Sequence, residues 1–520
     1  MLRLFKFTIA LLYITLIPAT AQTIKGPKGE EFTRRVIAQK LSDPWEITYG
    51  PDNHLWVTEA KGYKISRIDP ESGKRTVLLD LSQDRQFPRY DQQDEEQSGG
   101  KRWPQGGLMG LALHPELLQG KPYVYLAYIY EFKGADKEGD GCEAKEGGCY
   151  YTTRLVRYAY DVKDQKLTNP EVLCDTIPAS NDHNSGRLTV APVAGQNYLF
   201  LTVGDMGAGQ YANGGRPNKA QNSSSYEGKV LRFNLEPDAD KGQFGKWIPN
   251  DNPFTSERKQ NAVWSTGHRN AQGLAYAEVN GTGYLYSSEH GPFSDDELNI
   301  IYKGKNYGHP LIIGYNDGNY DGLAAGTTPY SFLPGTWQTT YPTIRSEAAN
   351  AKALGAAYQD PIKSLYPHPN KFLKSVMSKI KADTDKPDWP SEAPSSLSVY
   401  TAAAIPGWQN SLLIPSLKNG KLFRLQLNAK GNGITGDTLS YFKAPIRYRD
   451  IAISPDGTRL YLSTDSVTVT SGPSEEAPPD ENACSGCIME FTYKSGGTPG
   501  SKEAARKQNN QTGLLRQEQE

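Results

Sequence analysis

A chain of 520 residues is long enough for several domains, but β-propellers and barrels of this length often form a single unit. Its 57 Lys and Arg residues nearly balance its 58 Asp and Glu residues, which argues against a general role on nucleic acids or membrane surfaces. The 51 Gly, 35 Pro and 31 Tyr residues are typical of a turn-rich β protein.

The N-terminus has the three parts of an export signal. Arg3 and Lys6 are basic, residues 7–16 are apolar, and residues 17–21 end in the Ala-Thr-Ala sequence typical of a cleavage site. A membrane anchor, the alternative, would need a longer apolar run of ~20 residues. We therefore predict that residues 1–21 are a signal peptide and that the mature protein is periplasmic or secreted, without a membrane span.

A strand-turn-strand pattern recurs about six times along the chain. Each copy has an apolar strand, a turn rich in Pro, Gly, Asp or Asn, and a second apolar or aromatic strand. Such repetition predicts an all-β, six-bladed propeller, whereas a pair of sandwiches would not need the same turn in every unit. The copies span residues 47–57, 111–126, 188–202, 274–286, 400–413 and 451–462.

One propeller domain is expected over residues 32–493, closed by a strand at residues 32–38 that completes the final blade. Residues 91–103 are a polar departure from the repeat, and residues 317–386 form a long insertion in which residues 354–380 favour short helices. Residues 495–520 are rich in Gly, Lys, Gln and Glu and contain almost no apolar side chains, so we predict a disordered tail.

The chain contains five cysteines, and disulfides are expected in an exported protein. Cys142 and Cys149 bracket a Gly-rich loop that a disulfide would close. Cys484 and Cys487 have C-x-x-C spacing, for which we favour a local disulfide over a redox or zinc motif, because the sequence has no second pair or His nearby. Cys174 would then be the free thiol.

Residues 180–187, Ser-Asn-Asp-His-Asn-Ser-Gly-Arg, form a polar loop in front of the apolar run 188–190. Catalytic side chains are often located in loops held by a rigid strand. Histidine suits proton abstraction near neutral pH, and His183 is one of only seven histidines in the chain. Taken alone, a solvated His beside a turn Asp is the commoner arrangement, so a catalytic interpretation depends on the rest of the sequence.

Basic residues occur at the ends of predicted strands that are far apart in the sequence. In a propeller, the loops at one end of every blade converge on the central channel, so these side chains would meet there. Cations without matching acids predict a polyanionic ligand, because unpaired charges in a cleft are costly. Structural pairing with Asp450 and Glu289 is the alternative. The four basic residues are Arg269, Lys418, Arg447 and Arg449.

Residues 291–297, Gly-Pro-Phe-Ser-Asp-Asp-Glu, combine turn carbonyls with three carboxylates. Clustered oxygen ligands are what Ca²⁺ prefers, whereas Zn²⁺ prefers His or Cys. The segment therefore predicts a calcium site, with an ordinary acidic turn as the alternative.

Five longer motifs occur in one order along residues 32–493. They are Asp182-His183-x-Ser185-Gly186-Arg187, Gly267-His268-Arg269-Asn270-x-Gln272-Gly273-Leu274-Ala275, Glu289-x-Gly291-Pro292-x-Ser294-Asp295-Asp296-Glu297, Gly407-Trp408-x-Asn410-x-Leu412-Leu413-x-Pro415-Ser416-Leu417-Lys418 and Arg447-Tyr448-Arg449-Asp450. These motifs closely resemble the soluble glucose dehydrogenases of the glucose/sorbosone dehydrogenase family, which depend on pyrroloquinoline quinone (PQQ). The resemblance implies a six-bladed propeller that binds PQQ and Ca²⁺, in agreement with the repeat.

The resemblance also implies the reaction, in which the anomeric hydroxyl of an aldose loses its proton as hydride passes to C5 of PQQ. His183 matches the general base, and Asp205 matches the acid that orients it. Arg269 matches the residue beside the quinone oxygen, where a cation would stabilise the charge that develops. The residues that match substrate contacts are Gln105, Asp182, Arg269 and Trp389.

Cofactor and metal ligands are implied in the same way. The three carboxylates of PQQ would explain the cationic pocket, and the carbonyls of Gly291 and Pro292 match ligands of a Ca²⁺ ion that polarises PQQ. The residues that match contacts of PQQ are Arg269, Asn270, Lys418, Arg447 and Arg449. A second, structural Ca²⁺ site is matched by Glu297, Tyr307, Ile313, Tyr315, Asp317 and Glu347, the middle ones through backbone oxygens.

Some positions depart from the family pattern. Lys386 stands where the family has an aromatic residue near Trp389, and Tyr211 stands where a smaller apolar residue is expected. Further differences are the Cys142–Cys149 loop, the acidic stretch 91–96 and the Cys484/Cys487 pair. These departures leave the cofactor residues in place and leave the identity of the sugar open.

Two other functions fit part of these features. A calcium-dependent propeller hydrolase of sugar lactones would use the acidic cluster and His183 but needs no cationic pocket. A non-catalytic binding propeller would not need the cationic pocket either. Lys418, Arg447 and Arg449 therefore favour the dehydrogenase. Family members often form homodimers, and the chain has no C-x-x-C-H haem motif that would identify its electron acceptor.

Overall fold

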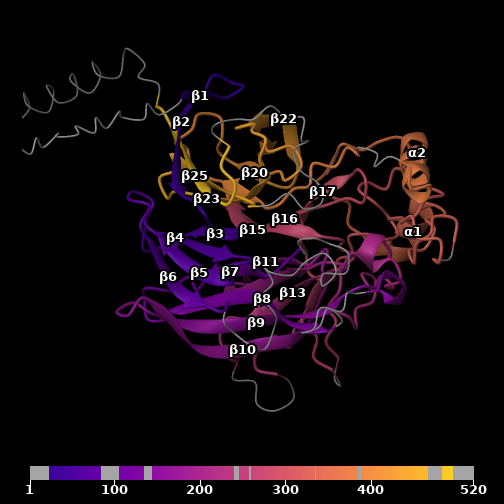
Figure 1. Cartoon of the computed structure of the whole chain (residues 1–520), viewed down its shortest axis with the longest axis horizontal. Helices are drawn as coiled ribbons and strands as arrows, with labels where there is room; N and C mark the ends of the chain where they lie inside the picture. The colour runs from indigo at the N-terminus through magenta and orange to yellow at the C-terminus, as the bar shows by residue number, and fades with distance from the viewer. Residues whose placement is uncertain are drawn as a thin grey trace, which may run out of the picture.

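Six β-sheets are arranged around a central channel in the computed structural model of the chain (Figure 1). The structure describes residues 23–82, 105–133, 143–238, 245–256, 259–333, 335–384, 389–466 and 483–495. In these residues, five sheets have four antiparallel strands and one sheet has five. Each four-stranded sheet contains strands that are consecutive in the sequence, so each is a propeller blade, and the predicted six-bladed all-β propeller is confirmed.

The first three blades follow one another along the chain, and the first strand of each is innermost. Blade 1 contains β3 Pro44–Tyr49, β4 Leu55–Glu59, β5 Lys64–Ile68 and β6 Arg75–Asp80. Blade 2 contains β7 Leu108–Leu113, β8 Tyr123–Lys133, β9 Tyr150–Asp161 and β10 Lys166–Ala179. Blade 3 contains β11 Ser185–Val193, β12 Gln196–Val203, β13 Lys229–Asn234 and β14 Val263–Thr266.

The sixth blade joins the two ends of the chain, and Figure 1 shows the indigo β2 beside the yellow β25. Closure by the early strand is therefore confirmed. Blade 4 contains β15 Ala271–Val279, β16 Thr282–Glu289, β17 Asp296–Ile300 and β18 Lys363–Leu365. Blade 5 contains β19 Ser398–Tyr400, β20 Ser411–Pro415, β21 Leu422–Leu427 and β22 Ile434–Tyr441. Blade 6 contains β23 Tyr448–Ile453, β24 Arg459–Thr464, β25 Ile488–Tyr493, β2 Glu31–Ala38 and β1 Thr23–Lys25.

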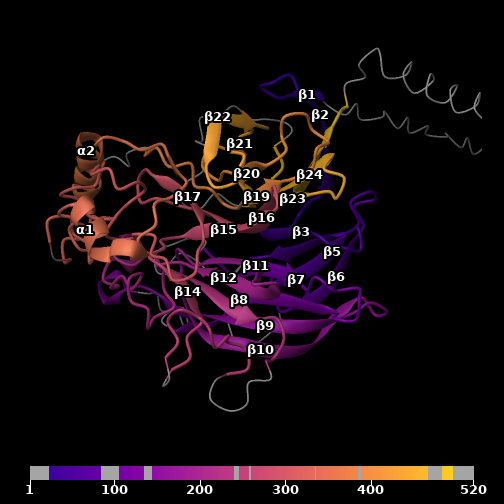
Figure 2. The same cartoon turned by 180° about the vertical axis from the view of Figure 1, so that it is seen from behind.

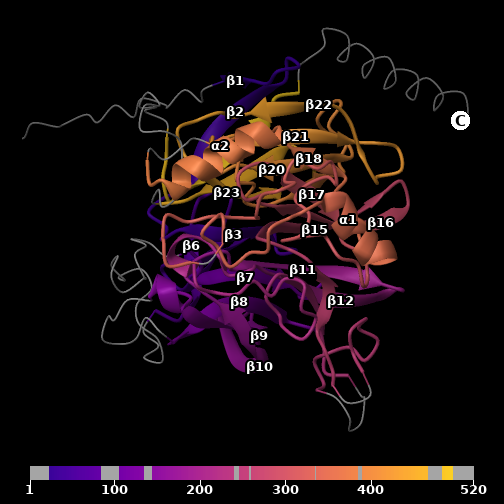
Figure 3. The same ribbon diagram turned by 90° about the vertical axis from the view of Figure 1, so that its right-hand side faces the viewer.

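Helices α1 and α2 lie on one side of the propeller, which is at the right in Figure 1, at the left in Figure 2 and toward the viewer in Figure 3. Helix α2 buries one face at i, i+3, i+4 and i+7 spacing against the cluster that contains Phe293 and Trp389. The α-helices are α1 Glu347–Leu354 and α2 Asn370–Lys381, and the 3₁₀ helices are η2 Ala144–Glu146, η3 Tyr211–Asn213 and η4 Gly355–Ala357.

The strand directions divide the loops between the two ends of the channel. Because neighbouring strands in a blade are antiparallel, the loop entering the first strand and the loop joining the second to the third lie at the same end. We call this the entry end. The loop joining the first strand to the second lies at the opposite end, the turn end. The Pro- and Gly-containing turns of the repeat, such as residues 50–53 and 454–457, lie at the turn end.

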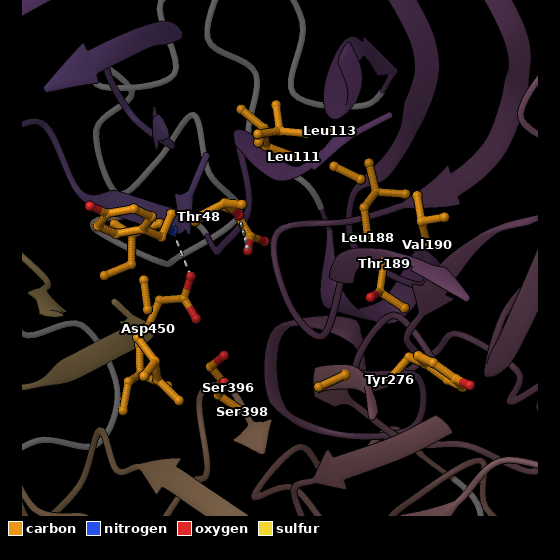
Figure 4. A pocket seen from close by; sticks show the side chains of 18 of the residues that line it. Thr48, Leu111, Leu113, Leu188, Thr189, Val190, Tyr276, Ser396, Ser398 and Asp450 are labelled. Carbon is orange, nitrogen blue, oxygen red and sulfur yellow. Dashed lines mark hydrogen bonds between the residues drawn. The ribbon is translucent and has the colours of Figure 1, made fainter. Parts of the chain in front are cut away.

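A cavity of about 710 Å³ opens in the channel toward the turn end, lined by the innermost strands of all six blades (Figure 4). Its walls include Leu111 and Leu188, and a buried ion cluster also lines it. Arg187 Nη1 lies 2.6 Å from Glu46 Oε2 and 3.0 Å from Asp450 Oδ2. This cluster ties blades 1, 3 and 6 together across the channel.

The long insertion contributes more than the short helices expected in residues 354–380. Strand β18 comes from this insertion, pairs with β17 and forms the outermost strand of blade 4, which the repeat did not predict. Helix α2 falls almost entirely within the expected range, whereas α1 precedes it and ends at Leu354. Residues 91–103 lie outside the described residues.

Cysteine pairing follows the sequence-based expectation where it is described. Cys484 and Cys487 form a disulfide, and Cys174 is a free thiol. Cys142 lies outside the described residues, so its pairing with Cys149 stays a prediction. The predicted signal peptide, residues 1–21, and the tail beyond residue 495 also lie outside. Across the described ranges, the structure contains no helix with the length and apolar character needed to cross a membrane.

Candidate functional site

A histidine and an aspartate face each other at the entry end of blade 3. His183 precedes β11, Asp205 follows β12, and His183 Nδ1 donates to Asp205 Oδ1 over 2.8 Å. Both side chains are buried. Because an ionised carboxylate only accepts, the Nδ1 atom holds the proton and the Nε2 lone pair stays free to act as a base.

The backbone around this pair has the tight geometry typical of functional sites. His183 has a φ of 46°, a left-handed conformation that costs free energy in a residue other than Gly. A Cβ atom at Gly204 would lie 1.8 Å from the carbonyl oxygen of His183, so only glycine allows the end of β12 to approach the His183 loop this closely.

Asp205 accepts hydrogen bonds from several further groups. His309 Nε2 and the Tyr341 hydroxyl each donate to Asp205 Oδ2 over 2.9 Å, and Asn218 Nδ2 donates to the same oxygen over 3.1 Å. Burial opposes ionisation of Asp205, but His183 and His309 hold the pKa of its carboxyl well below its usual range. Burial lowers the pKa of His309 despite its bond to the carboxylate. Asp205 is therefore a buried anion that orients His183.

Gln210 connects the free nitrogen of His183 to Arg269. Gln210 Nε2 donates to His183 Nε2 over 3.1 Å, and Arg269 Nη2 donates to Gln210 Oε1 over 3.1 Å. The amide occupies the position from which a substrate hydroxyl would have to approach the base. Gln105 contacts the same residue through the main chain, since its Oε1 accepts from the His183 backbone N–H over 3.3 Å. Asp182 is the buried neighbour of His183 and accepts from the same N–H over 3.1 Å.

Buried polar contacts fix the loop that contains Arg269 and Asn270. The Glu289 carboxylate accepts from the backbone N–H groups of both residues and from His268 Nδ1. Asn270 Oδ1 accepts from the backbone N–H and hydroxyl of Ser185, each over 3.2 Å. Glu289 therefore fixes the backbone of the Arg269 loop. The Arg269 guanidinium instead donates to the His290 carbonyl and to Gln210, so its positive charge is not paired with Glu289.

The expectation of cations without matching acids is wrong in one respect. Arg447 Nε donates to Asp465 Oδ2 over 2.9 Å, and Arg449 Nη2 donates to the same oxygen over 2.7 Å. One carboxylate thus serves two guanidinium groups, because β24 delivers Asp465 to the entry end beside β23. Asp450, the partner considered from the sequence, pairs with Arg187 instead. The pair of arginines retains one positive charge beyond its acid.

Buried nitrogens without hydrogen-bond partners mark where an anion would fit. Arg447 Nη1 and Arg269 Nε are both buried and have no such partner within the described ranges. Burial, followed by the Arg269 cation and His183, lowers the pKa of His290 well below its usual range, with a smaller contribution from Arg449. His290 is thus close enough to Arg269 of blade 4, His183 of blade 3 and Arg449 of blade 6 for their charges to affect its pKa. These residues fit a polycarboxylate such as PQQ, because it would satisfy the orphaned donors.

Lys418 and Trp389 meet beside this region. Lys418 follows β20, its Nζ donates to the Trp389 carbonyl, and it lies 5.8 Å from the centre of the Trp389 ring. Trp389 packs edge-on against Phe293 with ring centres 5.9 Å apart. Phe293 comes directly after Pro292 in the sequence. Trp389, the predicted sugar contact, therefore packs against the predicted metal-binding segment. Lys386 lies outside the described residues.

The acidic segment of blade 4 contains several buried carboxylates. Burial raises the pKa of Asp296 to about 6, and burial with the neighbouring Glu289 carboxylate raises the pKa of Glu297 well above its usual range. Asp296 Oδ1 accepts from the Gly291 backbone N–H over 2.9 Å. Carboxylates held this way favour either a proton or a cation, which fits the calcium expectation for Gly291 and Pro292.

A second group of acids converges on the loop at residues 313–318. Glu347 Oε1 accepts from the Ile313 N–H over 2.9 Å, its Oε2 accepts from the Gly318 N–H over 2.8 Å, and Glu297 Oε1 accepts from the Gly314 N–H over 2.9 Å. Burial raises the pKa of Glu347 to about 7. The loop also contains Tyr315 and Asp317. Tyr307, which precedes this loop in the sequence, is buried and stacks on His268.

Metal-ligating side chains alone do not form a cluster in the described ranges. Within them, no group of three or more His, Cys, Asp or Glu residues has the arrangement of a metal site. The predicted calcium sites use mostly backbone oxygens. The assignment of Glu297, Asp317 and Glu347 as ligands therefore stays a prediction.

Sequence reasoning missed four residues of this site: Gln210, Asn218, His309 and Tyr341. None belongs to a motif, and His309 is 104 positions from the aspartate to which it donates. The available signal was weak, namely polar residues in the long segments after β12 and β17. Together, the fold and these residues define a six-bladed propeller with an acid–base pair beside a cationic pocket.

Comparison with known proteins identifies the family. The family described as "Glucose / Sorbosone dehydrogenase" matches residues 41–341 and 373–470. The chain is 33% identical over 500 residues to quinoprotein glucose dehydrogenase B of Acinetobacter calcoaceticus, covering 92% of this chain and 95% of that protein. It is 27% identical over 433 residues to aldose sugar dehydrogenase YliI of Escherichia coli, covering 83% and 89%. The chain belongs to the glucose/sorbosone dehydrogenase family, which confirms the resemblance.

Solved structures share the propeller fold. The PQQ-bound aldose sugar dehydrogenase of Streptomyces coelicolor matches with a TM-score of 0.54 at 22% identity, covering 89% of this chain and 98% of that one. The apo-form aldose sugar dehydrogenase of Escherichia coli matches with a TM-score of 0.57 at 22% identity, covering 89% and 99%. At this identity the likeness supports the fold.

Proposed function

We propose that the protein is an exported, PQQ- and calcium-dependent dehydrogenase that oxidises an aldose at its anomeric carbon to the lactone. The observation that supports this most directly is the His183–Asp205 pair, with the unprotonated His183 nitrogen directed toward Gln210 and Arg269. Family membership supplies the reaction class, and the orphaned arginine nitrogens supply the reason for an anionic cofactor.

His183 is the general base of the proposed reaction. A sugar hydroxyl that displaces the Gln210 amide from His183 Nε2 can donate its own proton to that nitrogen. The imidazolium that forms is stabilised by Asp205, which is already anionic and only 2.8 Å away. The Nδ1–H bond to Asp205 keeps the ring in the tautomer that acts as a base, so no rearrangement precedes proton transfer.

Arg269 provides the positive charge on the other side of the substrate position. PQQ, when bound, supplies the electrophilic carbon that accepts the hydride from the anomeric carbon. Arg269 would stabilise negative charge that develops beside it, because its guanidinium is buried and is not neutralised by Glu289. The remaining proposed cofactor contacts are Asn270, Lys418, Arg447 and Arg449.

Calcium is proposed at two places. The carbonyls of Gly291 and Pro292 would bind an ion beside the cofactor, where Asp296 already orients the Gly291 backbone. A structural ion would be bound by Glu297 and Glu347 at the loop that contains Asp317. Backbone oxygens of Tyr307, Ile313 and Tyr315 complete that proposed set.

Substrate contacts are proposed for Gln105 and Asp182 at the base and for Trp389 across the pocket. Export by way of residues 1–21, a propeller domain over residues 32–493 and a disordered tail at residues 495–520 complete the proposal. A periplasmic or secreted location follows from the export signal. A homodimer and a separate electron acceptor are further expectations.

The decisive test is a titration of EDTA-treated protein with PQQ and Ca²⁺, with dye reduction measured across a panel of aldoses. We expect activity only when both are added, and the ranking of sugars then identifies the substrate. Absence of both PQQ binding and activity would contradict the proposal. Hydrolysis of sugar lactones, assayed on the same samples, tests the alternative calcium-dependent hydrolase, which the acidic segment alone would support.

A further inference from the structure

Asp205 is bonded to a second histidine that the proposed reaction does not use. His183 donates to Oδ1, whereas His309 Nε2 donates to Oδ2 over 2.9 Å. Gly207 N–H also donates to Oδ1, over 3.0 Å. The two carboxylate oxygens therefore have different partners: Oδ1 receives the base, and Oδ2 receives side chains from other parts of the chain.

His309 is held from several directions. Its backbone N–H donates to the Gly267 carbonyl over 3.0 Å, and its carbonyl accepts from Gln221 Nε2 over 2.7 Å. Its ring packs edge-on against Tyr341, the other donor to Oδ2, with centres 5.7 Å apart. Its remaining nitrogen, Nδ1, is buried and has no hydrogen-bond partner among the described residues. His309 Nε2 also lies 3.2 Å from Asn218 Nδ2, another donor to Asp205. In the part of the chain that the structure describes, the acceptor that the ring serves is thus the carboxylate that orients the base.

The geometry points to His309 as a positioning residue that acts on the His183 base through Asp205. A carboxylate with a single partner can rotate about its Cβ–Cγ bond, whereas donors on Oδ2 fix its plane and direct Oδ1 at His183 Nδ1. His309 has a second effect, because each neutral donor on Oδ2 withdraws negative charge that would otherwise stabilise the imidazolium of His183. Together with Tyr341 and Asn218 on the same oxygen, it thus adjusts both the direction and the strength of the Asp205 contact.

This inference rests on the proposed role of His183, and substitution of His309 tests it separately. His309→Leu removes the donor and puts an apolar side chain of similar size in its place, whereas His309→Gln places an amide N–H near the former Nε2 position. We expect His309→Leu holoenzyme to lose about tenfold in kcat, with KM and the affinity for PQQ changed less than about twofold. We expect His309→Gln to recover most of the loss.

The pH profile distinguishes positioning from simple structural support. The titratable and charged groups that face the base are Asp182, Asp205, Arg269, His290 and, behind Asp205, His309 and Tyr341. Loss of the His309 donor leaves more charge on Asp205 and favours the imidazolium. The acid limb of kcat/KM should therefore move to higher pH by about 0.5 unit or more in His309→Leu. Tyr341→Phe should move it in the same direction.

A double-substitution cycle completes the test. If His309 acts through Asp205, His309→Leu should have little effect on kcat in an Asp205→Asn background. His114→Leu, which replaces a buried histidine at the turn end, is the matched control and should leave the acid limb unchanged. Equal losses from His309→Leu in both backgrounds, or an unmoved acid limb with no recovery in His309→Gln, would overturn the inference. Wild-type protein without PQQ-dependent activity would instead contradict the proposed function.

Discussion

The two ends of the channel share the same strands but differ in what their loops do. The turn end contains the Pro- and Gly-containing turns of the repeat, such as residues 50–53 and 454–457. Its cavity is lined both by apolar side chains such as Leu111 and by the ion cluster of Arg187. The entry end has long, dissimilar loops with buried charge, including His183 and Asp205. The regularity visible in the sequence therefore belongs mainly to the end of the channel without the candidate chemistry.

Strand direction in this fold places the loops with candidate functional residues at one end of the channel and the turns of the repeat at the other. Because each blade returns its second strand to the entry end, the loops entering β11 and following β12 meet without any change in the strands themselves. Substitutions at the entry end should then change activity or cofactor affinity, and substitutions at the turn end should change stability alone. The following predictions test that division, in order of decreasing effect.

His183→Ala should give the largest effect, a loss of kcat of about 10³-fold or more, because it removes the base. PQQ should still bind with affinity within about twofold of wild type, since His183 is not among the cations of the pocket. Dye reduction with a saturating aldose and fluorescence titration with PQQ provide the two measurements. Turnover near the wild-type rate would show that the base is assigned wrongly.

Arg187→Met tests the ion cluster that lies between the two ends. Removal of the cation leaves Glu46 and Asp450 buried without it, which should lower the free energy of unfolding by about 3–5 kcal/mol. Chemical denaturation measures this change. Arg187→Lys keeps the charge and should lose less. A variant as stable as wild type would show that the cluster does not stabilise the ring.

Arg449→Met should weaken PQQ binding by about 10-fold to 100-fold, as expected for loss of a charge-assisted contact. At saturating PQQ, kcat should stay within about threefold of wild type, because Arg449 does not contact His183. Arg67→Met, which removes a guanidinium that pairs with Asp52 near the turn end, is the matched control. Equal PQQ affinity in both variants would place the cofactor elsewhere.

Glu46→Gln should change the pH dependence of stability. Burial, with Arg187 opposing and Asp450 adding to it, raises the pKa of Glu46 well above its usual range. The folded protein therefore holds a proton that the unfolded chain releases, so stability falls as pH rises from about 4.5 through the raised pKa. Denaturation at pH 5 and pH 8 should show a smaller difference for Glu46→Gln than for wild type, with unchanged kcat. An unaltered difference would contradict the shift.

Gly457→Ala should give the smallest effect and should affect stability only. Gly457 has a φ of 73°, and a Cβ atom there would lie 2.3 Å from the Ala402 Cβ. A loss of about 1–2 kcal/mol in unfolding free energy is expected from the left-handed backbone. Thermal unfolding and dye reduction together check it. A reduced kcat in this turn-end variant would break the division between the two ends.

The parts of the fold that the sequence predicts are those formed by local contacts, mainly the turns of the repeat and the strands beside them. The repeat was visible in the sequence because each turn and its two strands are local, as in residues 451–462. Closure by residues 32–38 could be inferred because one strand was left over. Strand β18 could not, since it pairs with β17 from the far end of a long insertion.

The candidate site was predictable where motifs preserve it. His183 was visible as a rare histidine in a polar loop, and Asp205 followed from the family resemblance. His309 and Tyr341 were not predicted, because their contacts with Asp205 exist only once blades 3 and 4 are adjacent. The pairing of Asp465 with two arginines was missed for a related reason: β24 brings it beside β23 only in the folded blade.

The pairing of β2 with β25 makes the order of synthesis important. Arg35 and Glu490, which form an ion pair across this junction, are made 455 positions apart. Until Ile488–Tyr493 has been made, the edge of β2 keeps unpaired N–H and C=O groups, the kind of edge that recruits strands from other chains. A product that stops before Ile488 contains every candidate site residue, yet it lacks the strand that joins β24 to β2, so its ring stays open.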